Sequence, residues 1–322
     1  MLWDLHFHTT DSDGNKTNKE RILQIQKLDP EKLGIWAATN HDRYSPWFVE
    51  LARSVWIKAI WATEISAHSN ELDLSLHITC YTPYLSESIR TLIDAVISGR
   101  KNKVLGQIEM LQSRWFPINT HDFFSWIVSE RMSPDSATNW HIARYLWKQK
   151  ETLKIVTDLT WWSVKTELDF MRECLRENGN HADIGYHRVP QYEPELSTLV
   201  GIARREEMIL SVAHPNCSFT KHLNKKYGAT SAMECIWLFH YRIVPILSIL
   251  WIHNYEVNTL ASPEWTDAIL KTVDKTRGYI SYWSDNHGLD HADDKHGIFG
   301  QTNPLLEANQ LQPIQEKLRT FL

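Results

Sequence analysis

Short apolar segments alternate with amphipathic segments along the first third of the chain. The apolar, β-branched segments predict four strands, at residues 2–7, 33–39, 57–66 and 74–81. Residues 17–28 and 46–55 space their apolar side chains as helices do. Thr17 can cap the first of these helices, because Glu20 stands three residues later, as a capping box requires. Repeated strand–helix units predict a parallel sheet or a barrel.

The middle of the chain has a different pattern. Between residues 86 and 180 the apolar side chains recur at three- and four-residue spacing and strand signals are few. We therefore expect a helical insertion at 86–180 within a single domain that spans residues 1–322. Strand patterns return at residues 208–213, 252–258 and 279–284. The apolar run 243–252 is far shorter than the ~20 residues of a membrane helix, so it predicts a buried strand or core helix and no membrane span.

The composition is that of a globular protein. The 322 residues include 23% charged and 43% hydrophobic side chains, enough for one large α/β barrel or two modest domains. A net charge of −5 without a basic run argues against an extended nucleic-acid surface, whereas a small phosphorylated substrate remains possible. No signal peptide precedes the first motif, which favours a cytoplasmic protein. The four cysteines form no Cys-x-x-Cys pair and are expected to be reduced, with Cys217 packed as a buried thiol. The oligomeric state is left open.

The first chemical signal is the run Asp-Leu-His-Phe-His-Thr-Thr-Asp-Ser-Asp-Gly at residues 4–14. His6 and His8 are two residues apart, so on a strand both imidazoles point to the same face. The Ser-Asp-Gly turn then presents Asp13 nearby. Two imidazoles and a carboxylate at the end of a strand can hold a metal ion. A His-x-His pair is weak evidence by itself and gains weight only from the rest of the chain.

Further imidazoles and carboxylates lie at or just after the other predicted strands. These residues are His41, Glu64, His77, His214, Asp285 and His287. In α/β barrels the carboxyl ends of the strands carry the active site. The combined set exceeds what one ion can use, and Glu64 could bridge two cations. Imidazole and carboxylate ligands suit Zn, Mn or Fe, and this mixture does not select among them.

In these motifs the chain resembles the polymerase-and-histidinol-phosphatase (PHP) family of metal-dependent phosphoesterases. The matching segments after residue 14 are Thr-Asn-His-Asp, Thr-Glu-Ile-Ser, Leu-His-Ile, Ala-His-Pro and Ser-Asp-Asn-His, and the match ends at residue 287. The resemblance implies an α/β fold, a distorted (β/α)7 TIM-like barrel with a helical insertion. It also implies a hydrolase acting on phosphate ester bonds, a phosphatase or phosphodiesterase that uses a metal-activated hydroxide. The chain is most similar to the small-molecule and nucleotide branch. Nucleotides, short oligonucleotides and histidinol phosphate are open as substrates.

The resemblance implies two or three divalent metal ions (Mn, Zn or Fe). The first ion would be held by His6, His8, Glu64 and Asp285; the second by Glu64, His77 and His214; the third by Asp13, His41 and His287. Glu64, Asp13 and His287 are also the expected catalytic residues. The family's His-Ile-Ala-Arg element is present as residues 141–144, and from it His141 and Arg144 are expected to bind the substrate phosphate. Ordinary helix-surface residues are the alternative for these two.

Two other functions stay open. Barrel hydrolases of the amidohydrolase type also begin with His-x-His, but they usually hold one or two metals and lack the set formed by Glu64, His77 and Ser-Asp-Asn-His. A non-catalytic metal-binding module is the second alternative. Degenerate ligand positions would favour such a module, yet none of the nine positions is missing.

The balance of tryptophan and glycine is unusual. The chain has 15 Trp and 12 Gly, whereas a glycine frequency of ~7% predicts about 23. Trp283 precedes Ser-Asp where the PHP pattern usually has Gly, and Trp56 and Trp251 stand where the family often turns from helix to strand through Gly. Trp47 and Trp61 lie one residue from other family glycines and count for less. Either a UGA codon read as Gly appears here as Trp, or a Trp-rich protein has repacked around these residues.

Overall fold

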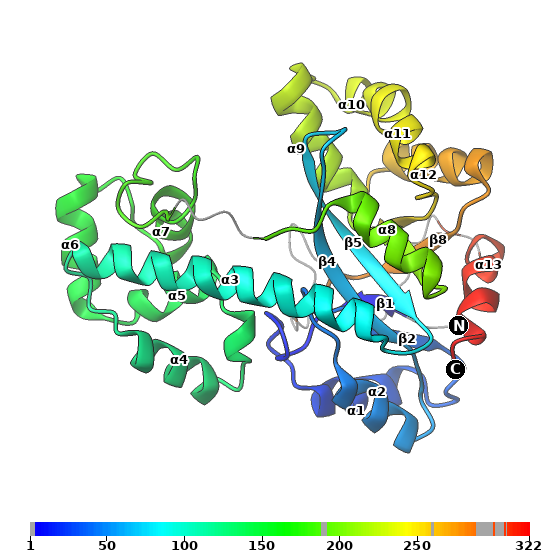
Figure 1. Ribbon diagram of the computed structural model, residues 1–322, viewed down its shortest axis with the longest axis horizontal. Coiled ribbons are helices and arrows are strands. Elements are labelled where there is room, and N and C mark those ends of the chain that lie inside the picture. The colour runs from blue at the N-terminus through cyan, green and yellow to red at the C-terminus, as the bar shows by residue number, and fades with distance from the viewer. Residues whose placement is uncertain (1–3, 188–191, 259–260, 288–298, 300–305, 307) are drawn as a thin grey trace. The chain divides into compact units, whose positions relative to one another are not determined.

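The computed structural model describes residues 4–187, 192–258, 261–287, 299, 306 and 308–322 (Figure 1). Its chain divides into two compact units, residues 1–93 with 193–322 and residues 94–192. The first unit is mixed α/β and the second is helical. The boundary between them falls within the long helix α3 (Glu87–Ser113).

The strands of the first unit form two sheets. The three-stranded sheet is parallel and has the order β1 (Asp4–Phe7), β2 (Ile35–Ala38), β3 (Lys58–Ala59). The five-stranded sheet has the order β4 (Trp61–Ser69), β5 (Leu74–Thr82), β6 (Ile209–Val212), β7 (Tyr255–Asn258), β8 (Ile280–Trp283). Isolated parallel bridges join the two sheets at Phe7 with Asn286 and at His41 with Glu64. These bridges connect β1 to the end of β8, and the end of β2 to β4.

The expectation of purely parallel strands is wrong for part of the second sheet. β4 pairs with β5, and β5 with β6, in the antiparallel sense. Only residues 70–73 separate β4 from β5, which is too short for the crossover that parallel strands require. The strand predicted at 57–66 is also divided at Ile60 into β3 and β4, which belong to different sheets. The strand predicted at 74–81 is one residue longer as β5, and the other predicted strands are present with shorter bounds within the described residues.

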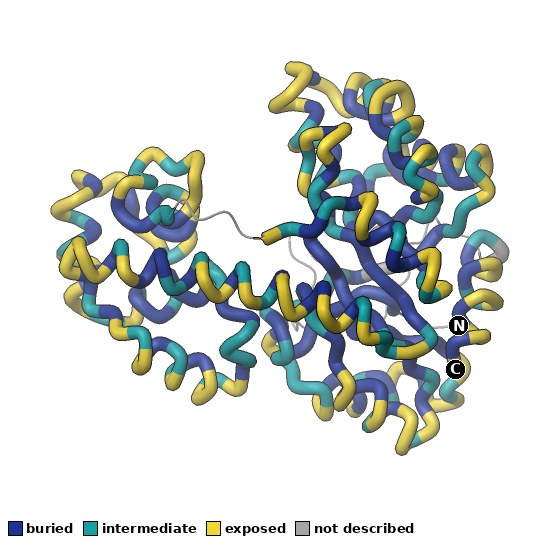
Figure 2. Tube along the Cα trace, in the orientation of Figure 1, coloured by how far each residue is buried: buried dark blue, intermediate teal, exposed yellow. Residues whose placement is uncertain are grey.

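The described helices of the first unit lie in the segments between and after the strands. They are α1 (Asn18–Leu28), α2 (Pro46–Ser54), α8 (Leu196–Arg205), α9 (Pro215–Tyr227), α10 (Ala232–Leu238), η2 (Phe239–Ile243), α11 (Val244–Ile249), α12 (Pro263–Thr276) and α13 (Ala308–Arg319). The predicted capping box of α1 is confirmed. The Thr17 hydroxyl accepts from the Glu20 N–H at 3.2 Å, and Glu20 accepts from the Thr17 N–H at 2.7 Å. The strands are the most continuously buried part of this unit (Figure 2).

The run α10–η2–α11 contains residues 243–249 of the apolar segment 243–252 that the sequence singled out. Within the described residues, Ala232–Ile249 is the one helix long and apolar enough to cross a membrane, by length and composition only. Cys235, Phe239, Ile243 and Leu247 recur every four residues and are buried. Such a stripe is typical of a helix that packs one face against a core, and 28% of the run is buried. A single helix of this kind is weak evidence for a membrane span. The predicted buried segment is thus helical and buried on one side, whereas Ile249 is exposed.

The second unit has a helical core of its own. Its described elements after α3 are α4 (Thr120–Ser129), η1 (Pro134–Ser136), α5 (Asn139–Trp147), α6 (Lys150–Thr160) and α7 (Glu167–Cys174). Ile108, Phe123, Ile142, Leu146 and Phe170 are all fully buried in one apolar cluster. The helical pattern predicted for residues 86–180 is therefore present, and these helices bury their apolar faces against one another.

Candidate metal centre

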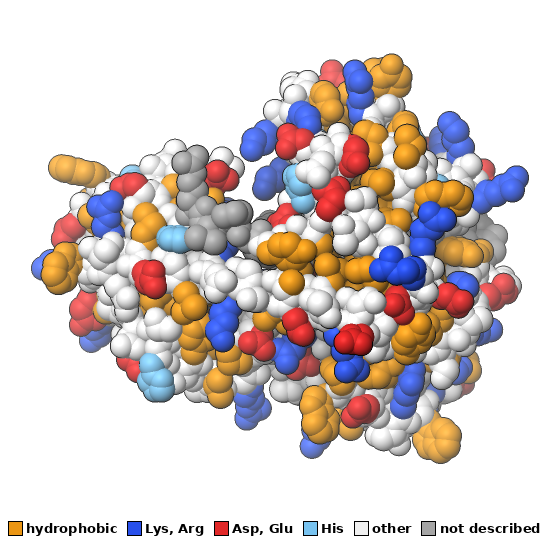
Figure 3. Space-filling model, in the orientation of Figure 1, with side chains coloured by type: hydrophobic (Ala, Val, Ile, Leu, Met, Phe, Trp, Pro, Cys, Tyr) orange, Lys and Arg blue, Asp and Glu red, His pale blue; other side chains and the backbone are white. Residues whose placement is uncertain are grey.

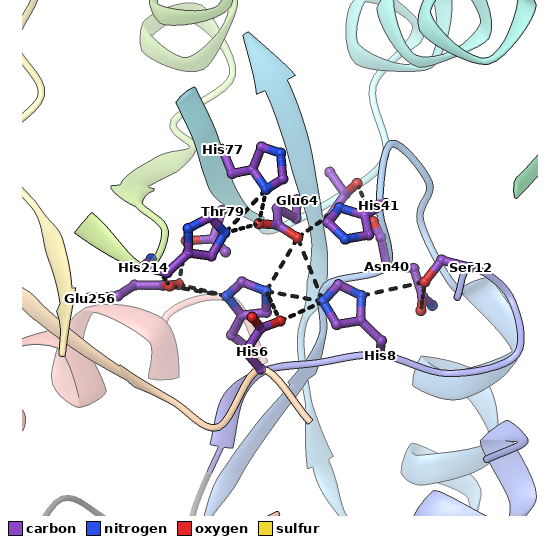
Figure 4. A network of polar contacts seen from close by, with 12 residues as sticks. His6, His8, Ser12, Asn40, His41, Glu64, His77, Thr79, His214 and Glu256 are labelled. Atoms are coloured by element: carbon purple, nitrogen blue, oxygen red, sulfur yellow. Dashed lines mark hydrogen bonds and ion pairs between the residues drawn. The ribbon is translucent and has the colours of Figure 1, made fainter. Parts of the chain in front are cut away.

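His6 lies on β1 and His8 follows directly after it, and both side chains are buried. Their Nε2 atoms are 3.2 Å apart, as the two-residue spacing on a strand predicts (Figure 4). Asp285 approaches the pair from the turn after β8, with its Oδ1 3.0 Å from His8 Nε2 and 3.5 Å from His6 Nε2. Three possible metal-ligand atoms, from residues near the two ends of the chain, therefore lie close together.

Glu64, on β4, lies in the middle of the cluster with no exposed surface. Its Oε1 is 2.9 Å from His77 Nδ1 and 3.0 Å from His214 Nε2, and these two nitrogens are 3.1 Å apart. Its Oε2 is 2.8 Å from His41 Nδ1 and 3.4 Å from His6 Nε2. The carboxylate thus joins imidazoles that come from β1, β5 and the segments after β2 and β6.

Asp13 completes the arrangement from the turn after β1. Its Oδ2 is 3.2 Å from His287 Nε2 and 3.6 Å from His41 Nε2, and its Oδ1 is 3.6 Å from His8 Nδ1. The His8 ring stacks on those of His287 and His41, with centroids 4.3 and 4.5 Å away. The structure therefore brings together all nine residues that the sequence singled out.

The spacing and chemistry of these atoms fit divalent metal ions. Three groups have donor atoms that lie within 4.8 Å of one another: His8, Asp13, His41 and His287; His6, His8 and Glu64; His41, Glu64 and His77. Ligands about 2.1 Å from a tetrahedral ion stand about 3.4 Å from each other, close to the contacts seen here. Within the described residues, the buried Glu64 Oε2 accepts no hydrogen bond of regular geometry, although imidazole nitrogens lie 2.8–3.6 Å from it. An ion shared by these donors would satisfy it.

Burial and neighbouring charges set the protonation states of His8, Glu64 and Asp13 in the cluster. Burial, together with His287 and His41, lowers the pKa of His8 to about 3 and keeps this imidazole neutral. Burial raises the pKa of Glu64 and of Asp13, but the surrounding imidazoles outweigh it and hold each pKa well below its usual range. The cluster therefore offers ionised carboxylates and a neutral imidazole, the forms that bind metal.

Three residues in or beside the cluster have left-handed backbone conformations. The φ angles are 34° at His214, 50° at Asp42 and 50° at Asp285. A side-chain-bearing residue in this region stores about 1–2 kcal/mol. Asp42 accepts a hydrogen bond from the Ser66 N–H at 3.0 Å, which helps to hold its segment in place. Left-handed residues also occur elsewhere in the chain, so these three conformations agree with a functional site without singling it out.

Three residues that the sequence did not single out support the cluster. Glu256, on β7, contacts His6, and Arg21, on α1, donates to the His8 carbonyl at 3.0 Å. Asn40 accepts from the Ser12 hydroxyl at 2.8 Å. A charge inside the predicted strand 252–258 was a usable signal for Glu256. Arg21 lies among other charged residues on an amphipathic helix, so its burial left no signal.

Three other predicted residues have different surroundings. His141 and Arg144 lie on α5 of the second unit. The Nδ1 of His141 accepts from the Thr138 N–H at 3.1 Å, and the guanidinium of Arg144 lies 5.0 Å from the Trp140 ring centroid. Their role in substrate binding stays a prediction. The expected burial of Cys217 is wrong, because its position on α9 is exposed.

Comparisons with known proteins show what the fold resembles. No protein-family model and no curated protein sequence matches the chain. A crystal structure from Bifidobacterium adolescentis, of a protein assigned as a metal-dependent phosphoesterase, is 18% identical with a TM-score of 0.67, covering 98% of this chain and 95% of its own. An amidohydrolase from Chromobacterium violaceum, with bound sulfate and no metal, is 18% identical with a TM-score of 0.65, covering 99% and 96%. At such identity the shared property is a mixed α/β fold.

Proposed function

We propose that the protein is a metal-dependent phosphoesterase of the PHP type. The observation that carries the proposal is the convergence of nine imidazole and carboxylate side chains, with the buried Glu64 at their centre. The two bridges between the sheets support a strand arrangement that closes as a distorted (β/α)7 barrel. The likeness to a phosphoesterase structure agrees with the proposal at the level of the fold.

The ligands are proposed to divide among three sites, and neighbouring sites share contacts, because His41 Nδ1 lies 2.8 Å from Glu64 Oε2 and His8 Nδ1 lies 3.6 Å from Asp13 Oδ1. The first set is His6, His8, Glu64 and Asp285, with contacts of 3.0–3.6 Å between donor atoms. The second is Glu64, His77 and His214, with contacts of 2.9–3.1 Å. The third is Asp13, His41 and His287, with contacts of 3.2 and 3.6 Å. Glu64 offers one oxygen to each of the first two sets, so two or three ions of Mn, Zn or Fe could be held.

The residues of the chain divide the chemistry between them. Bound divalent ions would neutralise the phosphate oxygens and acidify a nearby water. Glu64 is fully buried, whereas the side chains of Asp13, His77 and His287 are 28%, 36% and 21% exposed, so the cluster is accessible to solvent at these three residues. There, Asp13 and His287, whose Oδ2 and Nε2 atoms lie 3.2 Å apart, would hold an ion next to the substrate phosphate. Glu64, Asp13 and His287 are therefore the proposed catalytic residues.

The proposed substrate is a small phosphate ester: a nucleotide, a short oligonucleotide or a compound like histidinol phosphate. On the face seen in Figure 3, basic and acidic side chains are interspersed, and no extended basic surface is visible there. Attraction of a phosphate therefore rests on the cations of the cluster, with His141 and Arg144 as proposed additional contacts. A cytoplasmic location stays part of the proposal.

Amidohydrolase activity is the second candidate function, because the Chromobacterium violaceum structure is about as similar in fold as the phosphoesterase structure. The test strips the protein of metal and reloads it with Mn²⁺, Zn²⁺ or Fe²⁺, then measures phosphate release from a panel of phosphate esters and hydrolysis of a panel of amides. We expect at least two equivalents of metal and turnover of phosphate esters alone. Amide turnover alone would favour the second candidate. Less than one equivalent of metal would favour a non-catalytic module.

A further inference from the structure

The carboxylate of Glu256 lies behind His6, on the opposite side of the ring from the ligand cluster. Its Oε2 and Oε1 are 3.0 and 3.2 Å from His6 Nδ1, whereas His6 Nε2 faces His8 and Glu64 (Figure 4). Glu256 is fully buried in β7. The two nitrogens of one imidazole thus meet two different environments.

Glu256 and Glu64 differ in the groups that contact their carboxylate oxygens. Glu256 accepts from the Thr79 hydroxyl at 2.8 Å, the Tyr81 hydroxyl at 3.4 Å and the His214 backbone N–H at 3.3 Å. Within the described residues, the side chain of Glu64 is contacted only by imidazole nitrogens. The oxygens of Glu256 are therefore occupied by protein donors, whereas those of Glu64 face possible ligands.

We propose that Glu256 is a positioning residue, which holds His6 with its proton on Nδ1 and so directs the Nε2 lone pair toward the metal. A carboxylate behind a ligating imidazole fixes the tautomer and the ring orientation. The bond to the His214 N–H also secures the strained start of α9. This inference rests on the metal centre of the proposed function.

The test compares Glu256→Gln with the wild type by chelator competition. We expect metal affinity to fall 10- to 100-fold, as for other partners of ligating histidines. Glu206→Gln is the matched control, since Glu206 pairs with Tyr84 at the surface, and it should bind metal as the wild type does. In the zinc-loaded wild type, nitrogen NMR should show the His6 proton on Nδ1.

Unchanged affinity in Glu256→Gln, or a His6 proton on Nε2, overturns the positioning role while the proposed function stands. A wild-type protein that binds no divalent metal overturns both. If Glu256→Gln fails to fold, Thr79→Val removes one donor to the same carboxylate. That variant should bind metal several-fold more weakly, and wild-type affinity would count against the inference.

A separate observation concerns Trp56, Trp115 and Trp251. Each follows the end of a helix and has a left-handed backbone, with φ of 65°, 67° and 62°. Their side chains are 82%, 87% and 65% exposed. A bulky residue at positive φ is uncommon, and three large apolar side chains at this position also lie in solvent.

The hydrogen bonds show why this position favours glycine. The Trp56 N–H donates to the Arg53 carbonyl at 3.0 Å, and the Ile57 N–H donates to the Ala52 carbonyl at 2.9 Å. The other two tryptophans have the same pair of bonds, and in each case the next residue is buried. This is the Schellman motif, whose left-handed residue is usually glycine.

The chain itself offers a comparison. Gly228 ends α9 with φ of 68° and is the one described glycine with positive φ. Trp161 and Trp162, after α6, are also left-handed and exposed. Arg131, Glu207 and Arg277 also have positive φ, but their exposed side chains are charged, whereas the exposed side chains of the three tryptophans are large and apolar.

We infer that Trp56, Trp115 and Trp251 are glycines in the protein as its own cell makes it, encoded by UGA codons that this cell reads as glycine. Trp47 in α2 and Trp61 in β4 do not have left-handed backbone conformations, so their backbone conformation does not favour glycine. The side chain of Trp283 lies outside the described residues.

The codons and the peptide masses of protein from its source cell test this inference. UGA codons with glycine masses at the three positions are expected, and UGG codons or tryptophan masses overturn it. In the recombinant chain, each Trp→Gly change should raise the urea midpoint of unfolding. The equilibrium constant for unfolding should fall roughly five- to thirtyfold. Trp36→Gly, in the buried strand β2, should lower the midpoint and serves as the control. Lower midpoints at the three cap positions would count against the inference.

Discussion

Replacement of Glu64 by glutamine tests the centre of the cluster with the smallest change in shape. The variant keeps the volume of a side chain that has no exposed surface and removes its charge. That charge faces His41, His77 and His214 at 2.8–3.0 Å and would face two of the proposed ions. Loss of the carboxylate should therefore weaken both sites at once.

The expected loss of metal affinity and activity follows from Coulomb's law. At an effective dielectric constant of about 20, two unit charges 4 Å apart interact with about 4 kcal/mol, which corresponds to about a thousandfold. Solvent screening is small because Glu64 is buried. We expect metal affinity to fall at least about 100-fold and kcat/KM for a phosphate ester about a thousandfold.

Metal content after dialysis and steady-state phosphate release measure the two effects. Glu206→Gln, which removes a surface carboxylate outside the cluster, should match the wild type in both. If Glu64→Gln retains metal and turnover within threefold of the wild type, the carboxylate is structural and the proposed centre is wrong.

Three further predictions follow from other contacts. Burial lowers the pKa values of His41 and His77, but the Glu64 carboxylate outweighs it and raises both above the usual value. Divalent metal should therefore displace protons from these imidazoles and bind more weakly as the pH falls. Calorimetry that gives the same binding heat in buffers of different ionisation enthalpy would contradict this. Arg21→Met removes charged donors to the His8 and Asn286 carbonyls and should destabilise the fold by roughly 3 kcal/mol in urea, whereas a loss below about 1 kcal/mol would refute their importance. Thr17→Ala should cost about 1 kcal/mol through the lost cap of α1, and an unchanged midpoint would refute it.

Local features could be predicted from the sequence because they depend on few residues. The same-face placement of His6 and His8 follows from the two-residue period of a strand, and the cap of α1 follows from Thr17 and Glu20. The helical character of residues 86–180 follows from apolar spacing alone. In each case the interacting groups lie within a few turns of backbone.

Features that depend on strand pairing were not predictable in the same way. The sequence indicated strand–helix alternation, but the short link between β4 and β5 imposes an antiparallel pair. The exposure of Cys217 depends on which face of α9 packs inward. Solvent exposure of a side chain follows from its neighbours in space, which spacing along the chain does not specify.

The amino-acid sequence alone specifies which imidazoles and carboxylates the centre contains and their local order. Folding of the whole chain sets which of these groups come into contact and what each one does. His6 and Glu256 are 250 positions apart, yet they are in contact because β1 and β7 both approach the cluster. The same packing removes Glu64 from water and surrounds it with imidazoles, and this environment holds its pKa low. Burial, charge and contact are properties of groups assembled in space, so they arise only when the strands have paired.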